Sequence, residues 1–262
     1  MSAKPLTNVK TFLLDMDGTF YLGGRLIEGS LRFIHALQET GRDFLFLTNN
    51  SSHSVEDYVS KLARLGLCVG PEKILNSTLA TAIACNARFP GQRAFVLGNE
   101  SMQRELTGAG ILIDQHRPDY VIVGYDTSLD YAKMTAVCDF VRAGLPYVAS
   151  HPDFNCPTDG GFAPDIGAIM AFIHASAGRH ADLIVGKPHR GIVDAALQRT
   201  GLPLQSLAMV GDRLYTDVAT GLNHGMLSIL VMSGETTPAM LEASDIRPDL
   251  VYERLESMIA DL

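Results

Sequence analysis

Several short apolar runs of this sequence end abruptly in residues that can do chemistry. Four such groups occur far apart along the chain, and each combines carboxylates, hydroxyls, amides or an ammonium group. In chain order they are Asp15, Asp17 and Thr19; Thr48, Asn49, Asn50 and Ser51; Lys187; and Asp212, Thr216 and Asp217. In a parallel α/β sheet the carboxyl ends of the strands form the ligand crevice, so these groups are expected to meet there.

Clustered carboxylates repel one another unless a cation accompanies them. Carboxylate oxygens with room for water favour Mg²⁺, and no Cys/His spacing typical of a zinc site is present. A lysine and a threonine hydroxyl directed at the same place indicate an anionic substrate, most simply a phosphate. The sequence therefore predicts a Mg²⁺-assisted site for a phosphorylated small molecule.

The carboxylates can be given roles within such a site. Asp15 can attack phosphorus and form an aspartyl-phosphate. Asp17, two residues on, lies on the same side of the emerging strand, where it can protonate the leaving alcohol and then deprotonate the hydrolytic water. Lys187 and the metal would neutralise charge on the phosphoryl oxygens.

The elements that must position these residues follow an alternating pattern. Short apolar runs predict buried strands, and stretches of helical period lie between them, which is typical of an α/β fold with a largely parallel sheet. Strands are expected at 11–14, 44–47, 94–97, 120–123, 147–149, 183–185, 207–210 and 227–231, and helices near 30–40, 54–65, 78–88, 130–143, 165–177, 190–200 and 216–223. Because the chemistry lies only on the two flanks, we expect the middle third to be a second, inserted domain.

Charge, apolar-run length and cysteine content argue against several classes of protein. The chain has 262 residues, 47% of them hydrophobic, and a formal net charge of −8, which argues against a nucleic-acid partner. The longest apolar stretches are far shorter than the ~20 residues of a membrane helix, and Asp15 interrupts any signal-peptide core. Four widely spaced cysteines suit a reducing compartment. We expect a cytoplasmic protein without a membrane partner.

These residues carry a resemblance to the haloacid dehalogenase-like (HAD) phosphatases. The order Asp15-x-Asp17-x-Thr19, Thr48-Asn49, Lys187 and Asp212 followed by Asp217 resembles the superfamily pattern. The flanking words DMDGTFYLGG, LTNNSS, VGKP and GDRLYTD are similar to those of the NagD-like, 4-nitrophenylphosphatase and pyridoxal-phosphatase branch. The resemblance covers the whole chain.

The resemblance implies a Rossmann-like, doubly wound parallel-sheet core with an inserted, smaller α/β cap domain. The cap would span residues 80–182, leaving 1–79 and 183–262 as the catalytic core. A homodimer formed through the cap is compatible with the resemblance.

The resemblance also implies roles at matching positions. Asp15 would be the nucleophile and Asp17 the general acid/base. Mg²⁺ would be held by the carboxylates of Asp15 and Asp212 and by the Asp17 backbone carbonyl. The remaining expected roles are phosphate binding by Thr48, the Asn49 backbone and Lys187, and orientation of metal-bound waters and Lys187 by Asp217.

For several other residues the sequence suggests further roles. Arg213 could touch the phosphate or the cap, or lie on the surface. In the loop over residues 150–165, His151 stands where the family more often has Asn, and it could contact substrate or fix the loop. Turn or cap roles suit Asp153, Asp159 and Asp165 better than metal ligation, and His189 is expected to begin a helix.

Three functions fit this set. The first is a phosphatase for small phosphomonoesters such as nucleoside monophosphates or sugar phosphates, which would also hydrolyse aryl phosphates. A phosphotransferase or mutase would use the same nucleophile with a different acceptor. A phospho-accepting module without turnover is the third, although the length of the chain and the presence of Asp17 favour a catalyst.

Overall fold

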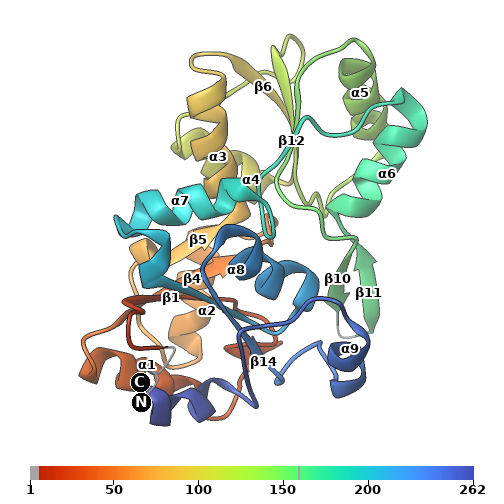
Figure 1. Cartoon of the computed structure of the whole chain (residues 1–262). Helices are drawn as coiled ribbons and strands as arrows, with labels where there is room; N and C mark the ends of the chain where they lie inside the picture. The colour runs from red at the N-terminus through yellow and green to blue at the C-terminus, as the bar shows by residue number, and fades with distance from the viewer. Residues whose placement is uncertain (1–5, 159) are drawn as a thin grey trace. The chain divides into compact units, whose positions relative to one another are not determined.

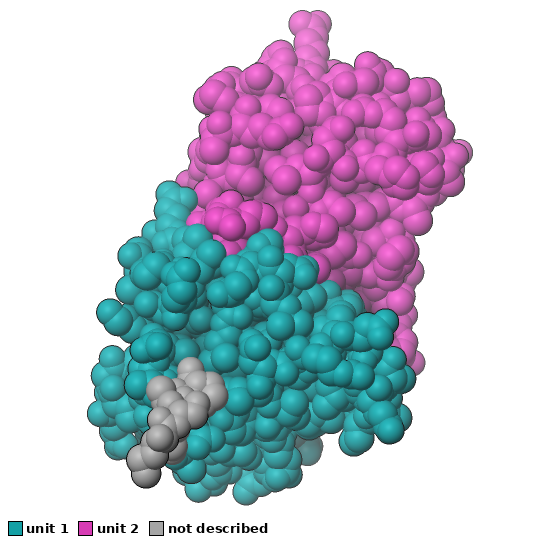
Figure 2. Space-filling model, viewed as in Figure 1, with its two compact units in different colours: residues 1–48, 58–75, 196–262 teal, residues 49–57, 76–195 magenta. Residues whose placement is uncertain are grey.

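Strands and helices alternate along the chain in the computed structural model, which describes residues 6–158 and 160–262 (Figure 1). The chain divides into two compact units, coloured separately in Figure 2. Unit 1 comprises residues 1–48, 58–75 and 196–262, and unit 2 comprises residues 49–57 and 76–195. Each unit is built around its own sheet.

The sheet of unit 1 has six strands in the order β15-β14-β13-β1-β4-β5. β1 pairs in parallel with β13 and β4, and the pairs β13–β14 and β14–β15 are parallel as well. The carboxyl ends of β1, β4, β13 and β14 therefore lie along one edge. The strands are β1 Thr11–Leu14, β4 Asp43–Thr48, β5 Ile74–Asn76, β13 Leu207–Gly211, β14 Leu227–Val231 and β15 Leu250–Tyr252.

Burial explains why these short segments form strands. All four residues of β1 are buried, as expected for a central strand of a parallel sheet covered on both faces. The Phe12 ring packs edge-on against Phe33 of helix α1 (Ser30–Glu39), with 5.8 Å between ring centroids. The expected strands at 11–14 and 227–231 agree with β1 and β14 residue for residue.

Unit 2 is a second α/β structure. Its five-stranded sheet has the order β12-β9-β8-β6-β7, and every pair is parallel. A buried apolar cluster that includes Val121, Tyr147 and Ile169 forms its core. The strands are β6 Arg93–Leu97, β7 Leu112–Ile113, β8 Tyr120–Val123, β9 Tyr147–Ala149 and β12 Leu183–Ile184.

Two antiparallel hairpins complete the strands, β2 Tyr21–Leu22 with β3 Arg25–Leu26 and β10 Asn155–Thr158 with β11 Gly161–Pro164. The α-helices are α1 Ser30–Glu39, α2 Val55–Arg64, α3 Ser77–Arg88, α4 Glu100–Gly108, α5 Tyr131–Arg142, α6 Ile166–Ala177, α7 Arg190–Thr200, α8 Ala219–His224 and α9 Pro238–Ala243. Shorter helical turns are η1 Pro71–Lys73, η2 Leu204–Ser206, the π-helical η3 Leu214–Val218 and η4 Leu255–Asp261.

Side-chain caps start the longer helices of unit 2. The carboxylate of Asp130 accepts a hydrogen bond from the Lys133 backbone at the start of α5, at 2.8 Å. Asn76 caps α3 in the same way by accepting from Leu79, at 2.9 Å. Such caps satisfy backbone N–H groups that have no partner inside the helix. In residues 6–158 and 160–262, none of the helices has the length and apolar character that crossing a bilayer requires.

Candidate active site

Asp15 and Asp212 lie side by side because the strands that precede them are paired. Leu14 of β1 is in register with Val210 of β13, and Asp15 donates its backbone N–H to the Val210 carbonyl at 2.9 Å. Asp15 follows β1 directly, and Asp212 follows β13 directly. The parallel sheet thus brings together two carboxylates that are almost 200 positions apart in the sequence.

Asp217 joins these two residues in unit 1. One carboxylate oxygen of each of Asp15, Asp212 and Asp217 lies within 4.8 Å of the other two. Asp15 is half-buried, whereas Asp212 and Asp217 are buried, so water screens their mutual repulsion poorly. This donor set of hard oxygens, without Cys or His, fits a divalent cation of the Mg²⁺ type.

The Asp212 carboxylate is held from two sides. The backbone N–H of Glu235 donates to its Oδ2 at 2.6 Å, and the Thr19 hydroxyl donates to Oδ1 at 3.4 Å. Glycines make room for it: a Cβ added to Gly234 would lie 2.0 Å from Oδ2, and one added to Gly18 would lie 2.4 Å from it. The backbone itself therefore fixes the position of this carboxylate.

Arg213 supplies a positive charge beside the carboxylates. Its Nε lies 2.9 Å from a carboxylate oxygen of Glu235, and its backbone N–H donates to Asp217 at 3.1 Å. Burial alone would lower the pKa of the guanidinium, but the neighbouring groups, Asp15 foremost, raise it above its ordinary value. Arg213 is only partly exposed, so the structure places it against these acidic groups rather than on the open surface.

Asp17 is exposed, two residues beyond the half-buried Asp15. The turn that carries it is closed by a 2.7 Å hydrogen bond from the Gly18 N–H to the Tyr21 carbonyl, and Gly18 adopts a left-handed φ of 86°. The Lys61 ammonium lies 3.7 Å from the centroid of the Tyr21 ring. Desolvation lowers the pKa of Lys61, while Asp17 opposes this shift and stabilises the charged form. A cation is thus held close to Asp17.

The remaining expected phosphate-binding residues are distributed over both units. Thr48 is the last residue of β4 in unit 1. Asn49 and Lys187 belong to unit 2, where the Lys187 backbone N–H donates to the Asn49 side-chain oxygen at 2.7 Å. Both residues are buried. Asn49 and Lys187 are 138 positions apart in the sequence, so this bond closes a long loop of the chain.

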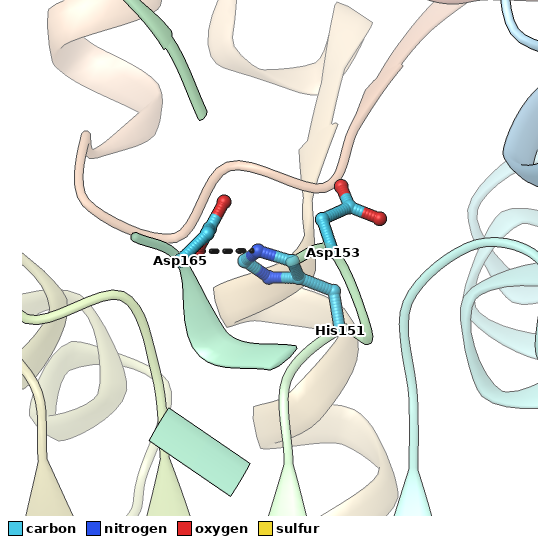
Figure 3. Close-up of side chains that lie close together, drawn as sticks. All are labelled: His151, Asp153 and Asp165. Carbon is cyan, nitrogen blue, oxygen red and sulfur yellow. Dashed lines mark hydrogen bonds and ion pairs between the residues drawn. The ribbon is translucent and has the colours of Figure 1, made fainter. Parts of the chain in front are cut away.

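A second group of ionisable side chains lies in unit 2 and consists of His151, Asp153 and Asp165 (Figure 3). His151 is completely buried, and its Nε2 lies 3.1 Å from the Asp165 carboxylate. The Nδ1 atom lies 3.2 Å from the Ser150 hydroxyl. These contacts support the loop-fixing interpretation of His151. Asp159, which was expected in the same loop, lies outside the described residues.

Sequence reasoning overlooked the segment 233–236. It begins two residues after the end of β14. It donates a backbone N–H to Asp212 and the Ser233 hydroxyl to the Gly18 carbonyl at 2.8 Å, and it supplies the partner of Arg213. The strand-end rule that singled out Asp15 would have pointed to this segment, because Ser-Gly-Glu-Thr lies one residue beyond the predicted strand at 227–231.

The chain is similar to known protein families and to known proteins over most of its length. Residues 12–112 match the family described as haloacid dehalogenase-like hydrolase, and residues 184–258 match a related HAD-hydrolase-like family. An acid sugar phosphatase of Staphylococcus aureus strain MRSA252 is 35% identical over 255 residues, covering 97% of this chain and 98% of that protein.

Two solved structures show the same likeness. The 4-nitrophenylphosphatase of Thermotoga maritima superposes with a TM-score of 0.95 at 44% identity, with 98% of each chain covered. NagD from E. coli K-12 has a TM-score of 0.87 at 31% identity, covering 95% of this chain and 97% of that one.

The chain belongs to the haloacid dehalogenase-like hydrolases. Within that family it is a phosphoric monoester hydrolase of the NagD-like, 4-nitrophenylphosphatase branch, as the resemblance predicted. The expected α/β fold with a Rossmann-like parallel core is confirmed as well.

Proposed function

We propose that this phosphatase is Mg²⁺-dependent and hydrolyses small phosphomonoesters through an aspartyl-phosphate on Asp15. The observation that carries the proposal is the meeting of Asp15, Asp212 and Asp217 carboxylates within 4.8 Å at the carboxyl ends of β1 and β13. The sugar phosphatase and the aryl phosphatase among the similar proteins support this substrate class.

Asp15 and Asp17 divide the reaction between them. A carboxylate oxygen of Asp15 attacks phosphorus, so that an O–P bond forms while the bond from phosphorus to the leaving oxygen breaks. Asp17 gives its proton to that leaving oxygen, and then accepts a proton from the water that cleaves the aspartyl-phosphate. The exposure of Asp17 allows it to exchange protons with solvent between turnovers.

Positive groups must balance the phosphate charge. Mg²⁺ would be held by the carboxylates of Asp15 and Asp212 and by the Asp17 backbone carbonyl, and when bound it would screen the nucleophile from the phosphoryl oxygens. Asp217 would orient the metal-bound waters and Lys187. Thr48, the Asn49 backbone and Lys187 would hold the transferring phosphate, with Arg213 as a further contact.

The remaining features of the proposal concern the substrate and the assembly. Residues 80–182 would act as the cap that selects a small phosphorylated metabolite in the cytoplasm, and not a nucleic acid or a membrane lipid. The four cysteines are all free, which suits a reducing compartment. A homodimer formed through the cap would elute at twice the 28.3 kDa chain mass in size-exclusion chromatography with light scattering.

The nucleophile is tested with 4-nitrophenyl phosphate. Asp15→Asn should abolish turnover, because an amide does not form the covalent intermediate, and EDTA should abolish it reversibly. Asp245→Asn, which changes an exposed carboxylate of the same unit, is the matched control and should keep wild-type activity. Near-normal activity of Asp15→Asn would refute the proposal.

The general acid/base role needs a separate measurement. Because 4-nitrophenolate leaves without protonation, Asp17→Asn should release about one equivalent of it in a burst and then stall as the phosphoenzyme. Acid-quenched enzyme should then carry one phosphate per chain. In the wild type, release of inorganic phosphate equal to that of 4-nitrophenol, even with glycerol added, distinguishes hydrolysis from transfer to an alcohol.

A further inference from the structure

The side chain of Asn49 clamps the backbone of Lys187. Lys187 donates its N–H to the Asn49 Oδ1 at 2.7 Å, and the Asn49 Nδ2 donates to the Lys187 carbonyl at 3.0 Å. The two bonds engage a donor and an acceptor of the same residue, so they fix both its position and its orientation. Asn49 is 6% exposed and Lys187 is 2% exposed, so water does not compete for these bonds.

The carboxylate of Asp153 determines which way the Asn49 amide faces. Its two oxygens lie 3.3 and 3.2 Å from the Asn49 Nδ2. A carboxylate only accepts hydrogen bonds, and the amide nitrogen has two hydrogens, so one serves Asp153 and the other serves the Lys187 carbonyl. A flipped amide would place its oxygen against both the carboxylate and the carbonyl.

Close packing leaves this clamp little freedom. A Cβ added to Gly186, the residue before Lys187, would lie 2.6 Å from the His151 Cβ and 2.7 Å from the Asn49 Oδ1. Gly186 also donates its N–H to the Ser150 carbonyl at 2.7 Å. The backbone at Gly186 is therefore closely packed against His151, Asn49 and Ser150.

The buried histidine extends the network to two helices. The Ser77 hydroxyl, at the start of α3, donates to the Asn49 carbonyl and lies 3.5 Å from the His151 Nδ1. On the other side of the ring, His151 contacts Asp165, which also accepts the N–H of Ile166 at 2.7 Å at the start of α6. The loop that carries Asp153 is thereby anchored to both α3 and α6.

We propose that Asn49 and Asp153 are positioning residues that act through Lys187, and that His151 and Asp165 anchor the loop on which Asp153 lies. The inference rests on the proposed function, in which the Lys187 ammonium neutralises the transferring phosphoryl group. A lysine side chain has four flexible torsions, so its reach is defined only if its backbone is fixed. A misplacement of about 1 Å can cost on the order of 100-fold in rate.

Asp153 is tested with two substitutions and a double-mutant cycle. Asp153→Ala removes the orienting acceptor and should lower kcat on 4-nitrophenyl phosphate by about 100-fold, with KM changed by less than about 3-fold. Asp153→Asn keeps an oxygen that can accept a hydrogen bond from Asn49, so its kcat should fall by only about 10-fold. This second variant also tests the proposal if Asp153→Ala does not fold. In the Lys187→Ala background, adding Asp153→Ala should change kcat by less than about 2-fold, because the effect passes through the removed ammonium.

Asp126→Asn is the matched control, since Asp126 is also a buried carboxylate of unit 2 and pairs with Lys133 at 2.8 Å. Asp126→Asn should lower the melting temperature. It should change kcat by the same factor in the wild-type and in the Lys187→Ala background.

The outcomes separate the two proposals. The positioning inference is wrong and the proposed function stands if Lys187→Ala strongly lowers kcat but Asp153→Ala works within about 3-fold of wild type. The same holds if the two losses multiply in the double mutant. If Lys187→Ala itself keeps wild-type kcat while Asp15→Asn is inactive, the role of Lys187 is wrong, and the inference fails with it.

Discussion

Replacing Gly234 by alanine should disable the enzyme without touching any residue that reacts. Gly234 has no left-handed backbone angle, so alanine costs nothing there in backbone strain. The added Cβ would, however, lie 2.0 Å from the Oδ2, 2.5 Å from the Cγ and 2.8 Å from the Cβ of Asp212. The whole Asp212 side chain must therefore move, not only its end.

The size of that movement follows from the contact distances. To reach an ordinary contact of 3.4 Å, the methyl group and Oδ2 must separate by about 1.4 Å. Asp212 is only 2% exposed and receives the Glu235 N–H at 2.6 Å, so the movement also breaks or stretches that bond. A shift of this size should lower kcat by about 100-fold and weaken activation by Mg²⁺ by about 10–100-fold.

The assay is the rate on 4-nitrophenyl phosphate across a Mg²⁺ titration, together with a melting curve. Gly24→Ala is the control, because a Cβ at Gly24 meets no atom within 4 Å and its backbone angle is also not left-handed. It should leave the rate, the Mg²⁺ midpoint and the melting temperature unchanged. A Gly234→Ala enzyme with wild-type kcat and Mg²⁺ midpoint would refute the assignment of Asp212 to the metal site.

Three further measurements test the fold. Asp130→Ala removes the cap of α5 and should lower the free energy of unfolding by about 1 kcal/mol in a denaturant titration, without affecting catalysis. Phe12→Ala empties a fully buried site beside Phe33 and should cost about 3–5 kcal/mol in the same titration; a loss below 1 kcal/mol would contradict the packing of β1. Burial raises the pKa of the Cys85 thiol to about 12, so at pH 8 less of it is thiolate than of an ordinary cysteine, and it should resist a disulfide reagent in the folded protein while the exposed Cys68 reacts.

The central strands could be predicted from the sequence, whereas the edge strands β7 and β15 were not predicted. β1 and β14 are mostly apolar and almost completely buried, because both faces of a central parallel strand are covered. β7 and β15 contain only two and three residues, and their apolar side chains are partly exposed, so such short runs do not distinguish a strand from a loop. What makes them strands is pairing with β6 and β14, which is a long-range contact with no local signature.

Within the site, too, side chains with a local sequence signal could be predicted, whereas long-range contacts could not. The strand-end rule led to Asp15 and Asp212 because their side chains carry the chemistry. The contribution of Glu235 to Asp212 is a backbone N–H, which every residue except proline possesses, so the sequence can point to the segment after β14 but not to this hydrogen bond. The Asn49 clamp on Lys187 joins residues 138 positions apart, and only the folded chain shows that the amide faces a backbone rather than a ligand.

Two glycines in the loop after β1 differ in how much variation they should tolerate over evolution or in a saturation library. Gly18 and Gly23 both have left-handed backbone angles, 86° and 58°, which asparagine and aspartate also adopt. At Gly23 no atom lies within 4 Å of an added Cβ, whereas at Gly18 that space is filled by Asp212. Deep mutational scanning should therefore recover asparagine and aspartate at residue 23 and glycine alone at residue 18.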